Sequence, residues 1–146
     1  MATKVVFDTS VLIPALMNSH INHRICLSWL ARAYKNEFKW AIPAHCLSEV
    51  YSGLTSIPSS PKIRPLSASQ AIDDLIKQAK IIELSARDYQ NAIDRCVLAN
   101  LSGGIIFDAL IVIAAEKFKC DCLLTYNKRD FSRLLGKNFS IIKSPS

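Results

Sequence analysis

The chain is short of several features, and each shortage excludes a class of protein. Its 146 residues include only four glycines and show no repeat period, which excludes collagen-like and solenoid architectures. No uncharged apolar run approaches the ~18 to 20 residues that a bilayer crossing needs, so we expect no membrane association. The N-terminal stretch has Asp8 within its apolar run and no small-residue cleavage pattern, so we expect no signal peptide and a cytoplasmic location.

What the chain does contain is apolar and basic. Half of its residues are hydrophobic, so we expect one compact domain over residues 1–146. Eighteen Lys and Arg against twelve Asp and Glu leave a net charge of +6, which suits binding to a polyanion but locates no site. The five cysteines include no C-x-x-C pair, so we expect buried free thiols.

Short apolar runs alternate with helical patterns along the chain. This alternation predicts a mainly parallel sheet covered by helices on both faces. We expect Ser10 to be the N-cap of the first helix and capping boxes to begin two helices at Ser67 and Ser85. Strands are expected at residues 4–7, 40–42, 81–84, 120–125 and 139–142, and helices at 11–17, 22–34, 43–54, 67–80, 85–101 and 105–118.

Two acids stand where a carboxylate is unusual. Asp108 is the only polar side chain between Gly104 and Ala115, and a carboxylate buried there must be protonated, hydrogen-bonded or bound to a cation. Asp8 follows the first strand directly, at the carboxyl end where open α/β sheets bind ligands. For both residues the alternative is an ordinary capping or turn role.

Further polar groups could join these two acids. Glu49 lies beside the apolar stripe of its helix, where a solvent-facing glutamate is the alternative. Asp130 follows the strand that ends at Thr125, and it either joins the acids or caps a short helix over 131–135. Thr125 and Asn127 offer neutral oxygens at the same strand end.

In their order along the chain, these residues resemble the PIN-domain ribonucleases, and most closely the VapC-type toxins of toxin–antitoxin pairs. The resemblance spans essentially the whole chain. It rests on Asp8-Thr-Ser-Val-Leu after the first strand, a glutamate on a following helix, Asp108-Ala-Leu-Ile in a buried helix, and Thr125-x-Asn-x-x-Asp130-Phe after a strand. It implies a three-layer α/β/α sandwich with a mainly parallel central sheet.

The resemblance also implies a metal site at one end of that sheet. Asp8, Glu49 and Asp108 match the family's three invariant acids, and Asp130 is the remaining carboxylate of the last motif. Asn127 stands where many relatives have Asp, so the number of bound ions stays open. Hard oxygen ligands favour Mg²⁺ or Mn²⁺ over Zn²⁺, and a dication would relieve the repulsion between the acids. We assign no such role to the three histidines His20, His23 and His45.

The implied activity is metal-dependent endoribonuclease hydrolysis of RNA phosphodiester bonds. The acids would be the catalytic and metal-binding residues, and the neutral side chains would position water or phosphate. The acids are Asp8, Glu49, Asp108 and Asp130, and the neutral side chains are Ser10, Thr125 and Asn127. Basic residues that could engage flanking phosphates are Lys62, Arg64, Lys128 and Arg129.

Two other functions stay open at this point. One is a catalytically weak PIN-like module that binds RNA or a protein, which Asn127 keeps possible. The other is a metal-dependent phosphatase, although Ser10 stands where the haloacid-dehalogenase type needs a second Asp. The resemblance implies two partners besides RNA: a small antitoxin covering the acidic cleft and a second copy of the chain in a homodimer. The basic, proline-rich stretch over 56–65 is our candidate contact with antitoxin or RNA.

Overall fold

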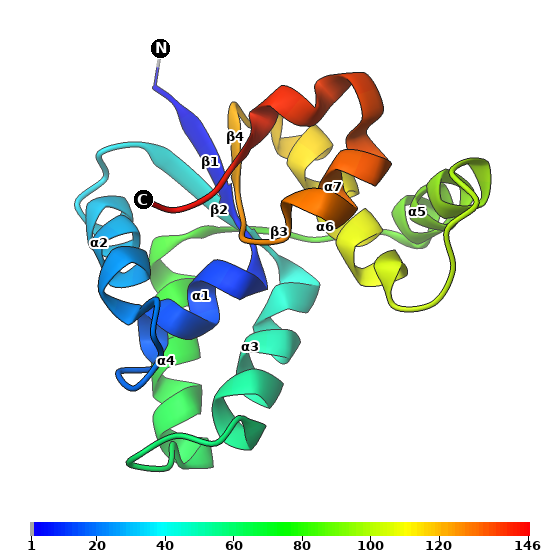
Figure 1. Cartoon of the computed structure of the whole chain (residues 1–146). Coiled ribbons are helices and arrows are strands. Elements are labelled where there is room, and N and C mark those ends of the chain that lie inside the picture. The colour runs from blue at the N-terminus through cyan, green and yellow to red at the C-terminus, as the bar shows by residue number, and fades with distance from the viewer. Residues whose placement is uncertain (1) are drawn as a thin grey trace.

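A central sheet of five parallel strands organises the molecule. The computed structural model describes residues 2–146, apart from the side chain of residue 139. The strand order is β3-β2-β1-β4-β5, and all four neighbouring pairs are parallel (Figure 1), as the sequence predicts. The strands are β1 (Lys4–Phe7), β2 (Lys39–Pro43), β3 (Lys80–Ile82), β4 (Cys122–Leu124) and β5 (Ile142–Lys143).

The helices form two groups with the sheet between them, so the predicted three-layer sandwich is confirmed. Helices α1 to α4 contact one another in one group, and α5 and α7 both contact α6 in the other (Figure 1). The helices are α1 (Thr9–Leu16), α2 (His23–Tyr34), α3 (Ala44–Ser56), α4 (Pro65–Gln78), α5 (Ala86–Leu98), α6 (Ile105–Phe118) and α7 (Lys128–Leu135), and a 3-10 helix follows at Gly136–Ile141.

Helix α6 is the buried helix that the apolar run predicts, with the predicted bounds. All residues from Ala109 to Ala115 are buried, and the helix ends before Lys119, which adopts a left-handed conformation with φ 54°. Asp108 lies just before this buried stretch. In the described part of the chain, no helix has the length and apolar character needed to cross a bilayer.

Two predicted helix starts are wrong. Helix α1 begins at Thr9 with Asp8 in the N-cap position, so Ser10 lies inside the first turn. Helix α4 begins at Pro65, not at Ser67. The fixed φ of proline suits the first helical position, and proline forces the preceding residue into extended backbone, so the helix boundary falls at Arg64.

The last strand is shorter than the predicted 139–142. Residues Gly136–Ile141 form a 3-10 helix directly after α7, and β5 covers only Ile142–Lys143. Its partner β4 has three residues, and the register pairs Leu123 with Ile142 and Leu124 with Lys143. Earlier residues of the predicted strand therefore have no partner in the sheet.

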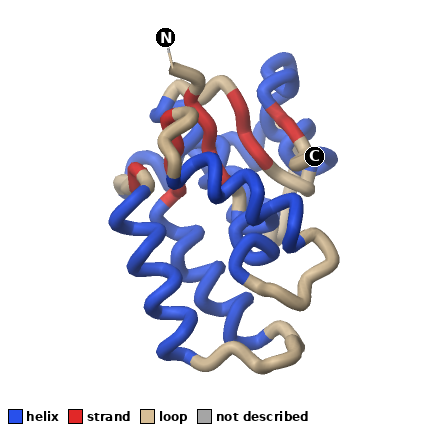
Figure 2. The backbone as a smooth tube through the Cα atoms, turned by 90° about the vertical axis from the view of Figure 1, so that its left-hand side faces the viewer, coloured by secondary structure: helices blue, strands red, loops and turns tan. Residues whose placement is uncertain are grey.

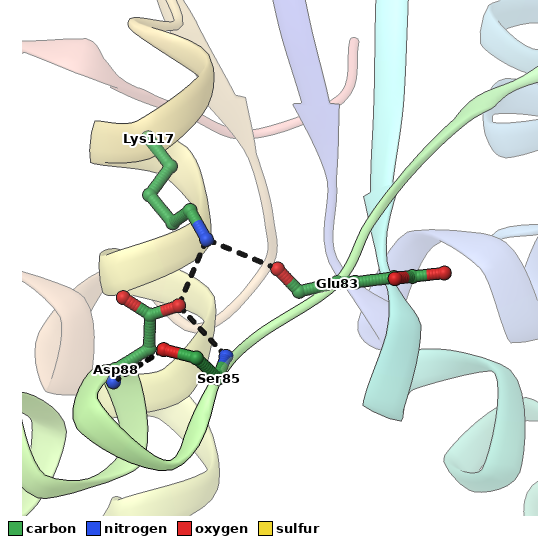
Figure 3. A network of polar contacts seen from close by, with 4 residues as sticks. All are labelled: Glu83, Ser85, Asp88 and Lys117. Atoms are coloured by element: carbon green, nitrogen blue, oxygen red, sulfur yellow. Dashed lines mark hydrogen bonds and ion pairs between the residues drawn. The ribbon is translucent and has the colours of Figure 1, made fainter.

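The predicted capping box at Ser85 is confirmed, and it is linked to α6. The backbone N–H of Asp88 donates to Ser85 Oγ (3.2 Å), and the backbone N–H of Ser85 donates to Asp88 Oδ2 (2.8 Å). Lys117 Nζ donates to the same carboxylate oxygen (2.8 Å) and to the carbonyl oxygen of Glu83 (3.1 Å), as Figure 3 shows. These bonds lower the pKa of Asp88 and fix the start of α5 to the end of α6.

We expect the Ser85→Ala variant to be less stable than the parent by about 1 kcal/mol, because the side chain that caps α5 is lost. Urea denaturation measures the free energy of unfolding. Ser102→Ala, at an exposed serine in the loop before α6, is the matched control, and its free energy of unfolding should differ little from that of the parent. Equal losses in the two variants would contradict the capping role.

Candidate active site

Asp8 is a buried acid at the carboxyl end of the central strand β1. It directly follows β1, and it is only 5% exposed. It occupies the N-cap position of α1, but its side chain caps no backbone N–H. Instead Oδ2 accepts hydrogen bonds from Ser10 Oγ and Thr125 Oγ1, both at 2.7 Å. Within the described residues no hydrogen bond reaches the other carboxylate oxygen, Oδ1, which is therefore free to bind a ligand.

The two hydroxyls that hold Asp8 are themselves fixed by the segment after β4. Ser10 Oγ accepts from the backbone N–H of Tyr126 (3.1 Å), and Thr125 Oγ1 accepts from the backbone N–H of Asn127 (2.9 Å). Each hydroxyl has one proton, and both protons point to Asp8. The orientation of the Asp8 carboxylate is thus set by residues that lie far apart in the sequence.

Asp108 lies in the first turn of α6 and faces the same segment. Gly104 is the N-cap of this helix, so Asp108 does not serve as the cap. Its Oδ2 accepts a hydrogen bond from Asn127 Nδ2 (3.2 Å). Burial, followed by the charges of the nearby carboxylates, raises the pKa of Asp108 to about 7. The carboxylates that contribute are, in decreasing order, Asp8, Asp130 and Glu49.

Glu49 approaches the two aspartates from α3. Its side chain is 36% exposed, yet Oε1 is buried and has no hydrogen-bond partner among the described residues. Burial raises the pKa of Glu49, and the charge of Asp8 raises it further. His45 Nε2 lies 3.4 Å from Oε1, and burial lowers the pKa of this imidazole, so His45 is neutral near pH 7.

Asp130 lies at the edge of the acidic group. Helix α7 begins at Lys128 with Asn127 as the N-cap, so Asp130 lies inside the first turn and does not cap the helix. Its Oδ1 forms an ion pair with Arg133 Nη1 (3.3 Å), and its side chain is 34% exposed. Because its charge raises the pKa of Asp108, Asp130 is close enough to add to the negative potential of the site.

The four predicted basic residues divide into two pairs. Lys128 and Arg129 are exposed at the start of α7, directly after Asn127. Lys62 and Arg64 belong to the loop between α3 and α4. Figure 2 shows that this loop lies at the end of the two helices away from the strands.

The side chains of α1 and α3 that surround Glu49 were not predicted from the sequence. The Thr9 hydroxyl and the Cys46 thiol lie close enough to oppose the rise in the pKa of Glu49. A cavity of about 560 Å³ opens beside them and is lined by Glu49, Ile13 and Phe107, among others. The spacing of His45 and Glu49, four residues apart on one helix, is the signal that could have predicted this cluster.

Comparisons with known proteins agree with this fold. The family model described as PIN domain matches residues 5–136. Among curated proteins, Ribonuclease VapC27 of Mycobacterium tuberculosis is 29% identical over 114 residues, which cover 78% of each chain. Ribonuclease VapC40 of the same species is 28% identical over 109 residues, covering 75% of this chain and 76% of the relative.

Solved structures share the fold at lower identity. Mycobacterium tuberculosis VapC20, titled a sarcin-ricin loop cleaving toxin, superposes with a TM-score of 0.70 at 12% identity, covering 88% of this chain and 93% of that one. A structure of VapBC2 from Rickettsia felis bound to promoter DNA superposes with a TM-score of 0.68 at 20% identity. The match covers 99% of this chain and 100% of that one. With a family model matched over most of its length, the chain belongs to the PIN domain family.

Proposed function

We propose that this protein is a divalent-metal-dependent endoribonuclease, acting on RNA as the toxin of a toxin–antitoxin pair. The observation that carries the proposal is the effect of three carboxylates, those of Asp8, Asp130 and Glu49, on Asp108, whose pKa is raised to about 7 by burial and by their charges. The ribonuclease names of the curated relatives support the choice of reaction and substrate.

The donor atoms at this site fit a hard divalent cation such as Mg²⁺ or Mn²⁺. Asp8 Oδ1 is free of hydrogen bonds in the described structure, and Glu49 Oε1 is buried without a partner. With Asp108 and Asp130 they would supply the carboxylate oxygens that such ions prefer. When bound, a divalent cation lowers the pKa of a water molecule and stabilises negative charge on the phosphate and on the leaving oxygen.

The protein's own residues would then divide the remaining tasks. Ser10 and Thr125 donate to one oxygen of Asp8, so their role is to orient that carboxylate. The amide nitrogen of Asn127 donates to Asp108 and would orient that carboxylate in the same way. Glu49, whose pKa is raised, is suited to accept a proton from the attacking water through the carboxylate oxygen that does not bind the cation.

RNA would approach across the start of α7. Lys128 and Arg129 are exposed next to Asn127 and would bind phosphates on either side of the cleaved bond. The net charge of +6 would favour association with a polyanion generally.

The test is incubation of the purified chain with end-labelled RNA in Mg²⁺ or Mn²⁺, against a matched reaction in EDTA. Discrete cleavage products that require the metal support the proposal. Binding of RNA without cleavage in either metal would contradict the proposal and favour the catalytically weak PIN-like binding module. Release of inorganic phosphate from a small phosphate monoester, with intact RNA, would favour the phosphatase.

We further propose that a small antitoxin protein covers the acidic group. The VapBC2 structure from Rickettsia felis and a toxin–antitoxin complex from Klebsiella pneumoniae share this fold. The cavity beside Glu49 offers such a partner an apolar surface, because Ile13, Ile57 and Phe107 line it. Phe107 is 53% exposed and Ile57 is 41% exposed in the chain alone.

A homodimer is the remaining predicted partner, and α5 is the surface where we expect it. Tyr89, Ile93 and Val97 recur every four residues on this helix, are 43%, 52% and 70% exposed, and form one apolar stripe. We expect Ile93→Asp to convert the dimer into a monomer in size-exclusion chromatography with light scattering. Leu66→Asp, at an exposed leucine on α4, should leave the dimer intact. A wild-type monomer at micromolar concentration would contradict this assignment.

A further inference from the structure

A second group of potential metal ligands lies beside the carboxylates, near the start of α3. His45, Cys46 and Glu49 each offer one ligand atom, and these atoms all lie within 4.8 Å of one another. His45 Nε2 is 3.4 Å from Glu49 Oε1 and 3.9 Å from Cys46 Sγ. Because His45 and Glu49 are four residues apart in the helix, α3 presents them on the same face.

These ligands differ in chemistry from the oxygen donors of the proposed catalytic ion. A thiolate, an imidazole and a carboxylate are a set that Zn²⁺ prefers, whereas Mg²⁺ and Mn²⁺ prefer oxygen alone. We propose that His45, Cys46 and Glu49 form a binding site for Zn²⁺, and that this site shares Glu49 with the catalytic carboxylates. The sequence alone predicts no such role for His45, because helical packing or surface exposure explains the three histidines more simply than metal ligation.

The observed separations are close to those that zinc requires. Zinc bonds to nitrogen, oxygen and sulfur are ~2.0 to 2.3 Å long, and tetrahedral geometry then places two ligand atoms about 3.3 to 3.8 Å apart. The separation of 3.4 Å between His45 Nε2 and Glu49 Oε1 lies in this range, and the separations that involve Cys46 Sγ are no more than 4.8 Å. Zinc in catalytic or exchangeable sites commonly has three protein ligands and one water, so three side chains suffice.

Independent features of the same side chains indicate polar atoms that are suited to bind a ligand. Glu49 Oε1 and His45 Nδ1 are buried and lack a hydrogen bond of good geometry among the described residues, although the Thr9 hydroxyl approaches Glu49 and the backbone of Phe107 approaches His45. Such atoms are costly to bury unless something binds them. Glu49 also lines the cavity of about 560 Å³, so this ligand is accessible from solvent.

Zinc binding would displace one proton, which leaves the Cys46 thiol. The Cys46 S–H bond breaks, the proton leaves to solvent, and the thiolate forms the bond to zinc. The neutral His45 ring supplies the lone pair of Nε2, and Glu49 supplies a carboxylate oxygen. The two negative ligands neutralise the charge of the ion, and no redox step is involved.

Occupation of this site would remove Glu49 from the catalytic group. Zinc held by His45 and Cys46 would therefore inhibit RNA cleavage even when Mg²⁺ is in excess, since zinc binds nitrogen and sulfur ligands much more tightly. This inhibitory consequence depends on the proposed ribonuclease function. The binding of zinc does not depend on it.

The first experiment measures binding directly on the metal-free chain. Co²⁺, a spectroscopic substitute for zinc, should give the near-ultraviolet charge-transfer absorption of a cobalt–thiolate bond, and Zn²⁺ should displace it. Cys46→Ser should abolish this band and weaken Zn²⁺ binding in calorimetry by at least about 100-fold, more than is typical for losing a residue that only supports a ligand. Cys96→Ser, at a buried thiol on α5, is the matched control and should retain both signals.

His45→Gln provides a second test if Cys46→Ser does not fold, which circular dichroism would show. It should weaken Zn²⁺ binding by a similar factor. No charge-transfer band in the wild type, or an unchanged band in Cys46→Ser, would overturn the site. In RNA cleavage, Zn²⁺ should inhibit the wild type and spare Cys46→Ser. A chain that cleaves no RNA at all would refute the ribonuclease function, while the cobalt spectrum would still decide the zinc site.

Discussion

Asp8→Asn is expected to lower the rate of metal-dependent RNA cleavage by at least about 10²- to 10³-fold, the loss typical of removing one electrostatic contact from an active site. Asparagine keeps the shape of the side chain and one oxygen that can accept from Ser10 and Thr125. It removes the negative charge that would bind the cation. Initial rates on end-labelled RNA at several Mn²⁺ concentrations measure the effect.

The fold should survive this change, because a neutral amide at position 8 would relieve the repulsion from Glu49 and Asp108. Circular dichroism and thermal unfolding should therefore show a variant at least as stable as the parent. Asp73→Asn, which neutralises an exposed aspartate on α4, is the matched control and should cleave normally. Similar rates for the parent and Asp8→Asn would contradict the assigned site.

The second large effect is the dependence of stability on pH. The pKa of Asp108 is about 7 in the folded chain, against 3.8 for an unperturbed aspartate, so the folded state binds more protons than the unfolded state between these values. The contribution of this group to stability is therefore fully present below pH 3.8 and is lost as pH rises through about 7. We expect the free energy of unfolding of the metal-free chain to fall over this range.

Urea denaturation in EDTA between about pH 4 and pH 8 measures this dependence. Asp108→Asn has no such group, so its stability relative to the wild type should increase with pH and become constant above about pH 7. Saturating Mn²⁺ should cancel the difference, because a bound cation favours the charged carboxylate. Parallel pH profiles for the two chains in EDTA would contradict the raised pKa.

Much of the fold could be predicted because local patterns and tertiary packing agree. Helix α6 is apolar on nearly all faces, so burial between the sheet and its neighbouring helices is its only stable position. The capping box at Ser85 is confirmed, whereas the similar pattern at Ser67 failed because Pro65 begins the helix two residues earlier. The C-terminal strand could not be predicted from its apolar residues, because its length is set by the register with β4.

The site was predictable where a strand ends and unpredictable where helices approach it. Asp8 and Thr125 follow neighbouring parallel strands, so the topology alone brings them together. That Tyr126 donates to the Ser10 hydroxyl, and that Asn127 donates to Asp108, depends on the path of the chain after β4. The cluster around His45 follows from the four-residue spacing of His45 and Glu49 on α3, whereas the approach of Thr9 to Glu49 depends on how α1 and α3 pack.

The position of β1 in the middle of the sheet has a consequence for protein synthesis. One neighbour of β1 is β2, but the other is β4, which is followed by Thr125 and leads to Asn127. A nascent chain can build β1, β2 and β3 first, yet it lacks the partner that orients Asp8 until β4 and Thr125 have been made. A newly made nuclease of this design would therefore become harmful to the RNA around it only after β4 has joined the sheet.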